Sequence, residues 1–228
     1  IKHHKSIAIF DLEMSAMQVA QRLLSSTGRI NLSYMKTGTK DNNVWSSLFE
    51  TKSILENSNI YIDDTTTITP SEILSKCRKR KMQSGLDMVV VDYLQLMKAE
   101  QKTGSPKDYN RQQEVSDLTR SLKLAARELD VPIIVLSQLN RDSEKQKRVP
   151  MLSDLRESGS IEQDADIVCF LNSLENMQKE QEGAIKAAGP KERPETILVD
   201  FIIAKQFINC VNTRSNFFRF CNRFSALT

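Results

Sequence analysis

Short apolar runs alternate with longer amphipathic stretches along this chain. The runs are rich in β-branched residues and too short for helices, which predicts strands at 6–10, 60–62, 88–91, 131–136, 167–171 and 196–204. The stretches between several of them place apolar residues at helical spacing, which predicts helices at 17–27, 45–57, 70–85 and 115–129. Strands that alternate with helices are typical of an α/β fold in which a mostly parallel sheet has helices on both faces.

One helix start is specified by a capping sequence. Thr69 suits the N-cap, Pro70 the first turn and Glu72 a hydrogen bond back to the cap, so a helix is expected to begin here and to stop near Gly85. Segment 98–110 is expected to be a loop and 137–164 a polar connection, while the Glu-, Lys- and Ala-rich segment 172–195 is expected to be an exposed insertion. The run 217–220 is a further candidate strand, which could form a C-terminal hairpin with 196–204.

The composition is that of one globular domain. Of 228 residues, 39% are hydrophobic and 27% are charged, which is enough apolar material for a core. No apolar run approaches the roughly 20 residues of a membrane-spanning helix. The first residues do not resemble a secretory signal, so a cytoplasmic protein without a membrane partner is expected. The four cysteines lie far apart and the two histidines are adjacent, which argues against a disulfide framework and a structural zinc site. A net charge of +3 does not by itself indicate nucleic acid.

Polar or acidic residues follow almost every predicted strand. In parallel sheets, ligands bind outside the carboxyl ends of the strands, so these positions are the first candidates for a site. They are Asp11 and Glu13, Asp63 and Asp64, Asp92, Ser137 and Gln138, and Lys205.

Three of these residues could act on a nucleotide. Asp92 ends the apolar strand MVVVD, an arrangement in which an aspartate faces the water shell of a nucleotide-bound magnesium ion. Glu13 could accept a proton from an attacking water, and Gln138 could detect a γ-phosphate because an amide both donates and accepts hydrogen bonds. Each also has a purely structural interpretation: a strand terminator, a glutamate favoured by a helix dipole, and a polar loop residue.

The stretch LSDLRESGSIEQDAD, residues 152–166, could bind a single-stranded nucleic acid. Arg156 can contact phosphates, and Gly159 permits close approach of a backbone. The structural alternative is a solvated loop with a helix cap at Ser153. The basic run KCRKRK on the helix after Thr69 would favour a polyanion nearby, although such runs are more often simply solvated.

Taken together, DLEMS, VVVDYLQLM, SQLNR and DLRESGSIEQDAD resemble the ATPase domain of DnaB-type replicative DNA helicases. The resemblance runs from Ser6 to about Lys205. It implies a RecA-like fold, a homo-hexameric ring around single-stranded DNA, and hydrolysis of ATP with Mg²⁺ at subunit interfaces. It also implies primase and a helicase loader as partners.

The resemblance implies roles for individual residues. Glu13 would be the catalytic base, Asp92 the magnesium-side carboxylate and Gln138 the phosphate sensor. Lys205 would reach the nucleotide of the neighbouring subunit. The DNA-contacting loop of the family is matched by Arg156, Glu157 and Gly159.

Two departures from the family pattern are visible. None of the seven glycines is followed by lysine, so the phosphate-binding sequence GxxxxGK[ST] is not found. Since the chain opens with Ile1, we expect that sequence shortly upstream, the domain to be incomplete at its N-terminus, and this chain alone to be inactive. The second departure is Phe207, which stands where the family has an arginine finger, a role that Arg214 could take over.

Three hypotheses therefore stay open. The chain could be the larger part of a helicase motor, or a non-catalytic remnant that binds single-stranded DNA or joins a ring. It could also be a different RecA-like ATPase of the recombination or clock type, although RESGSIEQDAD favours the helicase.

Overall fold

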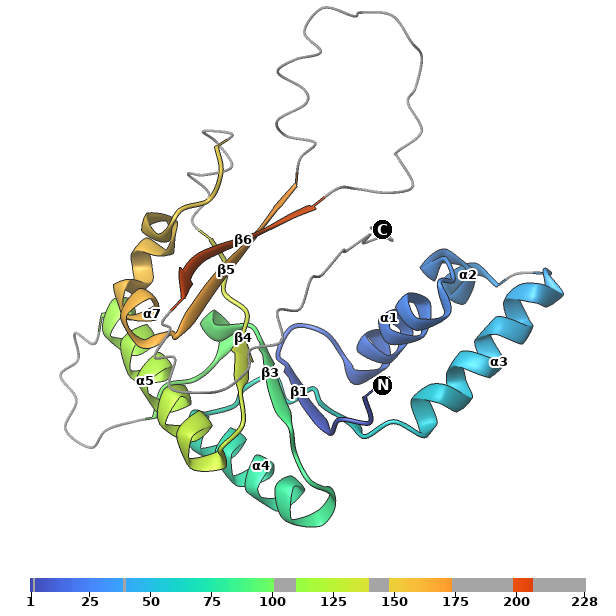
Figure 1. Cartoon of the computed structure of the whole chain (residues 1–228), viewed down its shortest axis with the longest axis horizontal. Helices are drawn as coiled ribbons and strands as arrows, with labels where there is room; N and C mark the ends of the chain where they lie inside the picture. The colour runs from blue at the N-terminus through green and yellow to red at the C-terminus, as the bar shows by residue number, and fades with distance from the viewer. Residues whose placement is uncertain (2, 39, 101–109, 140–147, 174–198, 207–228) are drawn as a thin grey trace, which may run out of the picture. The chain divides into compact units, whose positions relative to one another are not determined.

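The computed structural model describes residues 1, 3–38, 40–100, 110–139, 148–173 and 199–206 (Figure 1). The chain folds as two compact units, Ile1–Gln138 and Leu139–Thr228. In the described parts of the chain, no helix combines the length and the apolar character that a membrane span requires.

The first unit is built on a four-stranded parallel sheet. Its strands are β1 (Ile7–Asp11), β2 (Ile60–Asp63), β3 (Met88–Asp92) and β4 (Ile133–Val135), in the order β2-β1-β3-β4. All three pairings are parallel, and Ile7 of the inner strand β1 pairs with both Ile60 and Met88. Alternate residues of β1 and β3 are fully buried. The predicted parallel α/β sheet is thus confirmed, with strand bounds within three residues of those expected.

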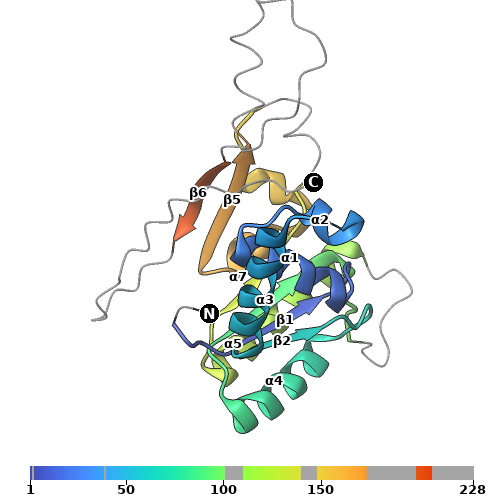
Figure 2. The same cartoon turned by 90° about the vertical axis from the view of Figure 1, so that its right-hand side faces the viewer.

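Helices cover both sides of this sheet. Figures 1 and 2 show α1 (Ala16–Gly28), α2 (Leu32–Thr37) and α3 (Asn42–Glu56) on one side, and α4 (Pro70–Ser84) and α5 (Arg111–Leu129) on the other. A short 3-10 helix, η1 (Leu94–Leu96), follows β3. Helix α2 was not among the predicted elements.

The cap of α4 forms as its sequence predicts. The amide of Glu72 donates to Thr69 Oγ1 at 3.3 Å, and the amide of Thr69 donates to Glu72 Oε2 at 2.8 Å. Pro70 occupies the first position of the helix, and Gly85 ends it with a φ of 76°. Because a φ in this region is unfavourable for a residue with a side chain, glycine suits the position.

The basic run at 76–81 is largely engaged within the first unit. Arg78 pairs with Glu128 of α5, and Lys81 donates to a main-chain carbonyl at the end of α5. The guanidinium of Arg80 lies 4.7 Å from the centre of the Tyr61 ring. These contacts hold α4 against α5 and β2. The basic run therefore has a structural role in addition to any interaction with a polyanion.

The second unit contains two short helices and an antiparallel strand pair. Its elements are η2 (Leu152–Ser158), α7 (Gly159–Asp164), β5 (Ile167–Ser173) and β6 (Val199–Gln206). Leu155, Val168 and Phe170 form its buried core, and Ile161 and Ile202 pack against them. The described part of the expected polar connection at 148–164 is more regular than a loop, because Leu152, Leu155 and Ile161 pack with the apolar residues of the strand pair.

The second unit ends, among the described residues, in β6, which corresponds to the predicted strand 196–204. β6 pairs with β5, with Phe170 opposite Ile202, whereas 217–220 lies outside the described residues. The expected insertion 172–195 begins inside a strand, since Asn172 and Ser173 belong to β5, and 174–195 also lies outside the described residues.

Candidate active site

The polar residues that follow β1, β2, β3 and β4 lie along one edge of the sheet. This follows from the parallel pairing, because the carboxyl ends of parallel strands share an edge. Asp11 of β1 lies directly opposite Asp92 of β3. Glu13 follows Asp11 by two residues, and Gln138 follows the end of β4.

The turn after β1 is held by the Asp11 side chain. Asp11 is 5% exposed, and its Oδ1 accepts hydrogen bonds from the amides of Glu13 at 3.1 Å and Met14 at 2.7 Å. The amide of Leu12 donates to the main-chain carbonyl of Asp92 at 2.7 Å. The backbone that carries Glu13 is thus attached to the end of β3, while the side chain of Glu13 is exposed to solvent. This is a position from which a carboxylate can reach a bound water.

Asp92 is half-buried at the end of β3. Burial raises the pKa of Asp92 above its ordinary value, and the negative charges of Asp11 and Glu13 raise it further, against a smaller opposing effect of Arg22. Negative charge therefore accumulates at this edge, and a cation would relieve the repulsion.

The carboxylates fit a magnesium ion that arrives with a nucleotide. Within the described ranges, no three His, Cys, Asp or Glu side chains gather closely enough to hold a metal by themselves. Mg²⁺ does not need such a group, because it keeps several waters and is usually bound through one or two carboxylates plus substrate phosphates. Asp92 is the carboxylate that this edge offers for that purpose.

Gln138 is held by a residue that sequence reasoning missed. The side-chain Nε2 of Gln95 donates to Ser137 Oγ at 2.9 Å and to the carbonyl of Gln138 at 3.3 Å. Its Oε1 accepts from the amide of Gln138 at 3.3 Å. The available signal was a single polar side chain inside the apolar run YLQLM after Asp92.

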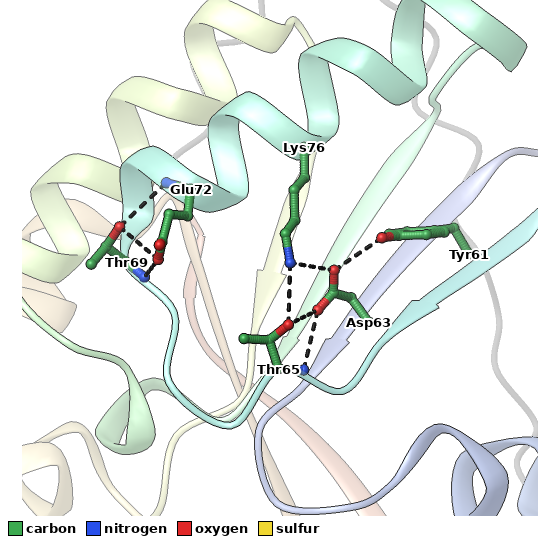
Figure 3. Close-up of polar contacts among 6 residues, drawn as sticks. All are labelled: Tyr61, Asp63, Thr65, Thr69, Glu72 and Lys76. Atoms are coloured by element: carbon green, nitrogen blue, oxygen red, sulfur yellow. Dashed lines mark hydrogen bonds and ion pairs between the residues drawn. The ribbon is translucent and has the colours of Figure 1, made fainter.

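The two carboxylates at the end of β2, Asp63 and Asp64, are engaged in structural contacts. Asp63 accepts hydrogen bonds from Lys76 Nζ at 2.6 Å, from Tyr61 Oη at 2.9 Å and from the Thr65 hydroxyl at 2.6 Å (Figure 3). Asp64 accepts from the amide of Ala16 at the start of α1, at 2.8 Å. The candidate site is therefore formed by the ends of β1, β3 and β4.

The ionised form of Asp63 is stabilised by its hydrogen-bond partners. Burial alone would raise the pKa of Asp63, but hydrogen bonds from Lys76, Thr65 and Tyr61 outweigh it and lower the pKa to about 2. Burial raises the pKa of Tyr61, and the neighbouring Asp63 raises it further. Asp63 is thus an ion-paired carboxylate that fixes α4 to β2.

The candidate DNA-contacting residues lie next to one another in the second unit. Arg156 and Glu157 are in η2, and Gly159 is the first residue of α7. Among the described residues, a Cβ added at Gly159 would meet no atom within 4 Å, and the φ of −50° at this residue is ordinary. Neither the backbone conformation nor the packing of the described residues around it demands glycine at this position. Lys205 of β6 donates to the main-chain carbonyls of Glu162 and, at 3.4 Å, Gln163.

The structure thus brings Glu13, Asp92 and Gln138 to one edge of the first unit, and Arg156, Glu157, Gly159 and Lys205 belong to the second. Phe207 and Arg214 lie outside the described residues.

Comparison with known proteins identifies the family. The sequence profile of the "DnaB-like helicase C terminal domain" matches residues 1–225. The chain belongs to this family. Membership in it also decides against the recombination-type and clock-type ATPases.

Named relatives of this DnaB-family chain are replicative helicases. It is 46% identical over 220 residues to the replicative DNA helicase DnaB of Geobacillus stearothermophilus, which covers 95% of this chain and 48% of that protein. It is 48% identical over 215 residues to the replicative DNA helicase DnaC of Bacillus subtilis, which covers 94% of this chain and 44% of that protein. The chain thus spans slightly less than half the length of either relative.

Solved structures confirm the fold of the DnaB-family chain. A "DnaB-Like Replicative Helicase" described with its primase interactions is 34% identical, with a TM-score of 0.75, over 90% of this chain and 46% of that one. A second solved structure, described as an "ATPase Domain", is 36% identical, with a TM-score of 0.76, over 90% of this chain and 68% of that one. The expected RecA-like fold is therefore confirmed.

Proposed function

We propose that this protein is the ATP-dependent motor of a replicative DNA helicase, which translocates on single-stranded DNA as a homo-hexameric ring and hydrolyses ATP at subunit interfaces. The observation that carries this proposal is the single sheet edge shared by Glu13, Asp92 and Gln138 in a chain of the DnaB-like family. Cytoplasmic location and association with primase and a helicase loader are part of the same proposal, supported by the replicative helicases among the relatives.

In the proposed reaction, a water molecule attacks the γ-phosphorus of ATP. A new phosphorus–oxygen bond forms, the bond to the β,γ-bridging oxygen breaks, and the proton of the water moves to the exposed carboxylate of Glu13. Bound Mg²⁺ would neutralise charge on the phosphates, and Asp92 would hold its water shell. Gln138 would donate to the terminal phosphate, and Lys205 would bring a positive charge to the nucleotide of a neighbouring subunit.

The proposed DNA contact is the end of η2 and the start of α7. Arg156 would pair with backbone phosphates of a single strand, and the open space around Gly159 would let the strand approach the protein backbone. Glu157 lies between them in the chain and would complete the contact by accepting hydrogen bonds from the nucleotides.

The hydrolysis proposal is tested with Glu13→Gln in the full-length gene product that carries this sequence. Magnesium-dependent ATP turnover should fall by roughly 10² to 10⁴, since the amide cannot accept the proton. Glu50→Gln, an exposed glutamate on α3, is the matched control and should leave turnover unchanged. Wild-type turnover in Glu13→Gln would overturn the assigned role of Glu13.

The DNA proposal is tested with Arg156→Ala. Single-strand affinity, measured by fluorescence anisotropy at several salt concentrations, should fall, and the slope of log K against log salt should decrease by about one. Arg120→Ala, on the exposed surface of α5, is the control. An unchanged affinity and slope would remove Arg156 from the DNA site.

The second candidate function is a non-catalytic helicase relative that binds single-stranded DNA or joins a ring. Phe207 at the position of the arginine finger favours it, because such a finger contributes roughly 10³ to 10⁵ in turnover where it has been measured. Single-strand binding by a full-length protein without ATP turnover would select this candidate over the motor.

A further inference from the structure

The side chain of Gln95 extends the pairing of β3 and β4 past the last main-chain hydrogen bonds. The main-chain pairing ends where the amide of Leu136 donates to the carbonyl of Val91 and the amide of Leu94 donates to the carbonyl of Leu136, both at 2.9 Å. Gln138 lies two residues beyond Leu136, and its main chain is bound by the side chain of Gln95. Gln95 Oε1 accepts from the main-chain N–H of Gln138, and Gln95 Nε2 donates to the main-chain carbonyl of Gln138, each at 3.3 Å. The side chain thus takes the place that a peptide group of a longer β3 would occupy.

This arrangement requires a primary amide at position 95. Only a group with an acceptor oxygen and two donor hydrogens can satisfy both main-chain groups of Gln138 and still donate to Ser137 Oγ, at 2.9 Å. Gln95 is itself attached to α5, because Arg111 Nη2 donates to its carbonyl at 2.5 Å and Arg111 also pairs with Glu114.

The two glutamines differ in exposure. Gln95 is half-buried and its amide is directed at the protein backbone, whereas the side chain of Gln138 is exposed. The exposed amide is the one able to meet a ligand, and the half-buried one determines where the backbone of the exposed one lies.

We propose that Gln95 is a positioning residue that fixes the main chain of Gln138, so that the exposed Gln138 amide can meet the terminal phosphate of the nucleotide. The inference rests on the proposed function, in which Gln138 detects that phosphate. A misplacement of a polar group by about 1 Å can reduce turnover by as much as roughly 10², so an anchor of this kind affects the reaction without touching the substrate.

The test replaces Gln95 by methionine in the full-length gene product. Methionine has a similar volume and no hydrogen-bonding amide, so packing is retained while all three contacts are lost. Gln113→Met, an exposed glutamine on α5, is the matched control. Amide hydrogen exchange at Gln138 should become roughly two- to tenfold faster in Gln95→Met, because a net hydrogen bond has been removed, and should be unchanged in the control.

Kinetics of ATP turnover then separate positioning from general destabilisation. We expect the kcat of Gln95→Met to fall by on the order of tenfold with little change in KM, because only the placement of Gln138 changes. A residue that acts through Gln138 should add no further loss in a Gln138→Ala background.

The outcomes for the inference and for the proposed function differ. Unchanged exchange at Gln138, or a kcat loss that is fully additive with Gln138→Ala, would overturn the role of Gln95 in an active enzyme. A wild-type protein without ATP turnover would overturn the proposed function, and the role of Gln95 toward a phosphate with it.

Discussion

Replacing Asp63 by asparagine tests how much one ion-paired carboxylate stabilises the first unit. The pKa of Asp63 lies at about 2 in the folded protein against an ordinary value of 3.8. Each unit of difference corresponds to about 1.4 kcal/mol, so the charged form contributes about 2 kcal/mol to the free energy of unfolding. The asparagine keeps an acceptor oxygen for Thr65 but places an N–H group near Lys76. We therefore expect Asp63→Asn to lower the free energy of unfolding by about 2 kcal/mol at pH 7.

The loss should depend on pH in a defined direction. Because the pKa of Asp63 is lower in the folded than in the unfolded state, its contribution is fully present above about pH 4 and is lost as the pH falls through about 2. The difference between wild type and Asp63→Asn, measured by urea unfolding followed by circular dichroism, should shrink across that window.

A neighbouring carboxylate provides the control for this experiment. Asp64→Asn keeps an oxygen that can accept from the Ala16 amide, and at this exposed position we expect a change within about 0.5 kcal/mol. A difference for Asp63→Asn that stays constant from pH 7 to pH 2.5, or that does not exceed the difference for Asp64→Asn, would refute the electrostatic reasoning.

Three further substitutions test the packing of each unit by thermal or urea unfolding. Thr69→Ala removes the cap of α4 and should cost about 1 kcal/mol; an unchanged melting temperature would contradict the capping role. Leu122→Ala, in the buried stripe of α5, should cost roughly 2–5 kcal/mol, whereas a loss below that of Thr69→Ala would show that the site collapses around the smaller side chain. Arg148→Ala leaves Asp154 without its two-point ion pair, at 2.6 and 2.7 Å, and should destabilise the second unit more than Arg148→Lys; equal effects would argue against the planar pairing.

The central strands and long helices could be predicted from the sequence because their signals are local. The buried runs of β1 and β3 and the stripe of α5 depend on spacing along the chain alone, and the cap of α4 depends on four consecutive residues. Helix α2 has only six residues, which is too short for a periodic pattern. Its one local signal was Asn31, whose side chain accepts from the amide of Ser33 at the helix start.

The unpredicted parts of the site depend on contacts between distant segments. Glu13, Asp92 and Gln138 could be chosen because each follows a strand, and parallel pairing then places them at one edge. The role of Gln95 could not be read in this way, because its partners Ser137 and Gln138 lie on another strand end. The partners of the basic run 76–81 could not be predicted either, because they are distant in sequence. Arg78 pairs with Glu128 only when α4 and α5 pack together.

The inner position of β1 has a consequence for synthesis on the ribosome. Both of its partners are made later, since Ile7 pairs with Ile60 and Met88. At a synthesis rate of roughly 5–20 residues per second, on the order of ten seconds pass between completion of β1 and completion of β3. During that interval Ala8 and Phe10, which are buried in the finished sheet, are exposed to chaperones and to other nascent chains. Slow translation before Met88 would therefore prolong the period in which this protein is prone to aggregate.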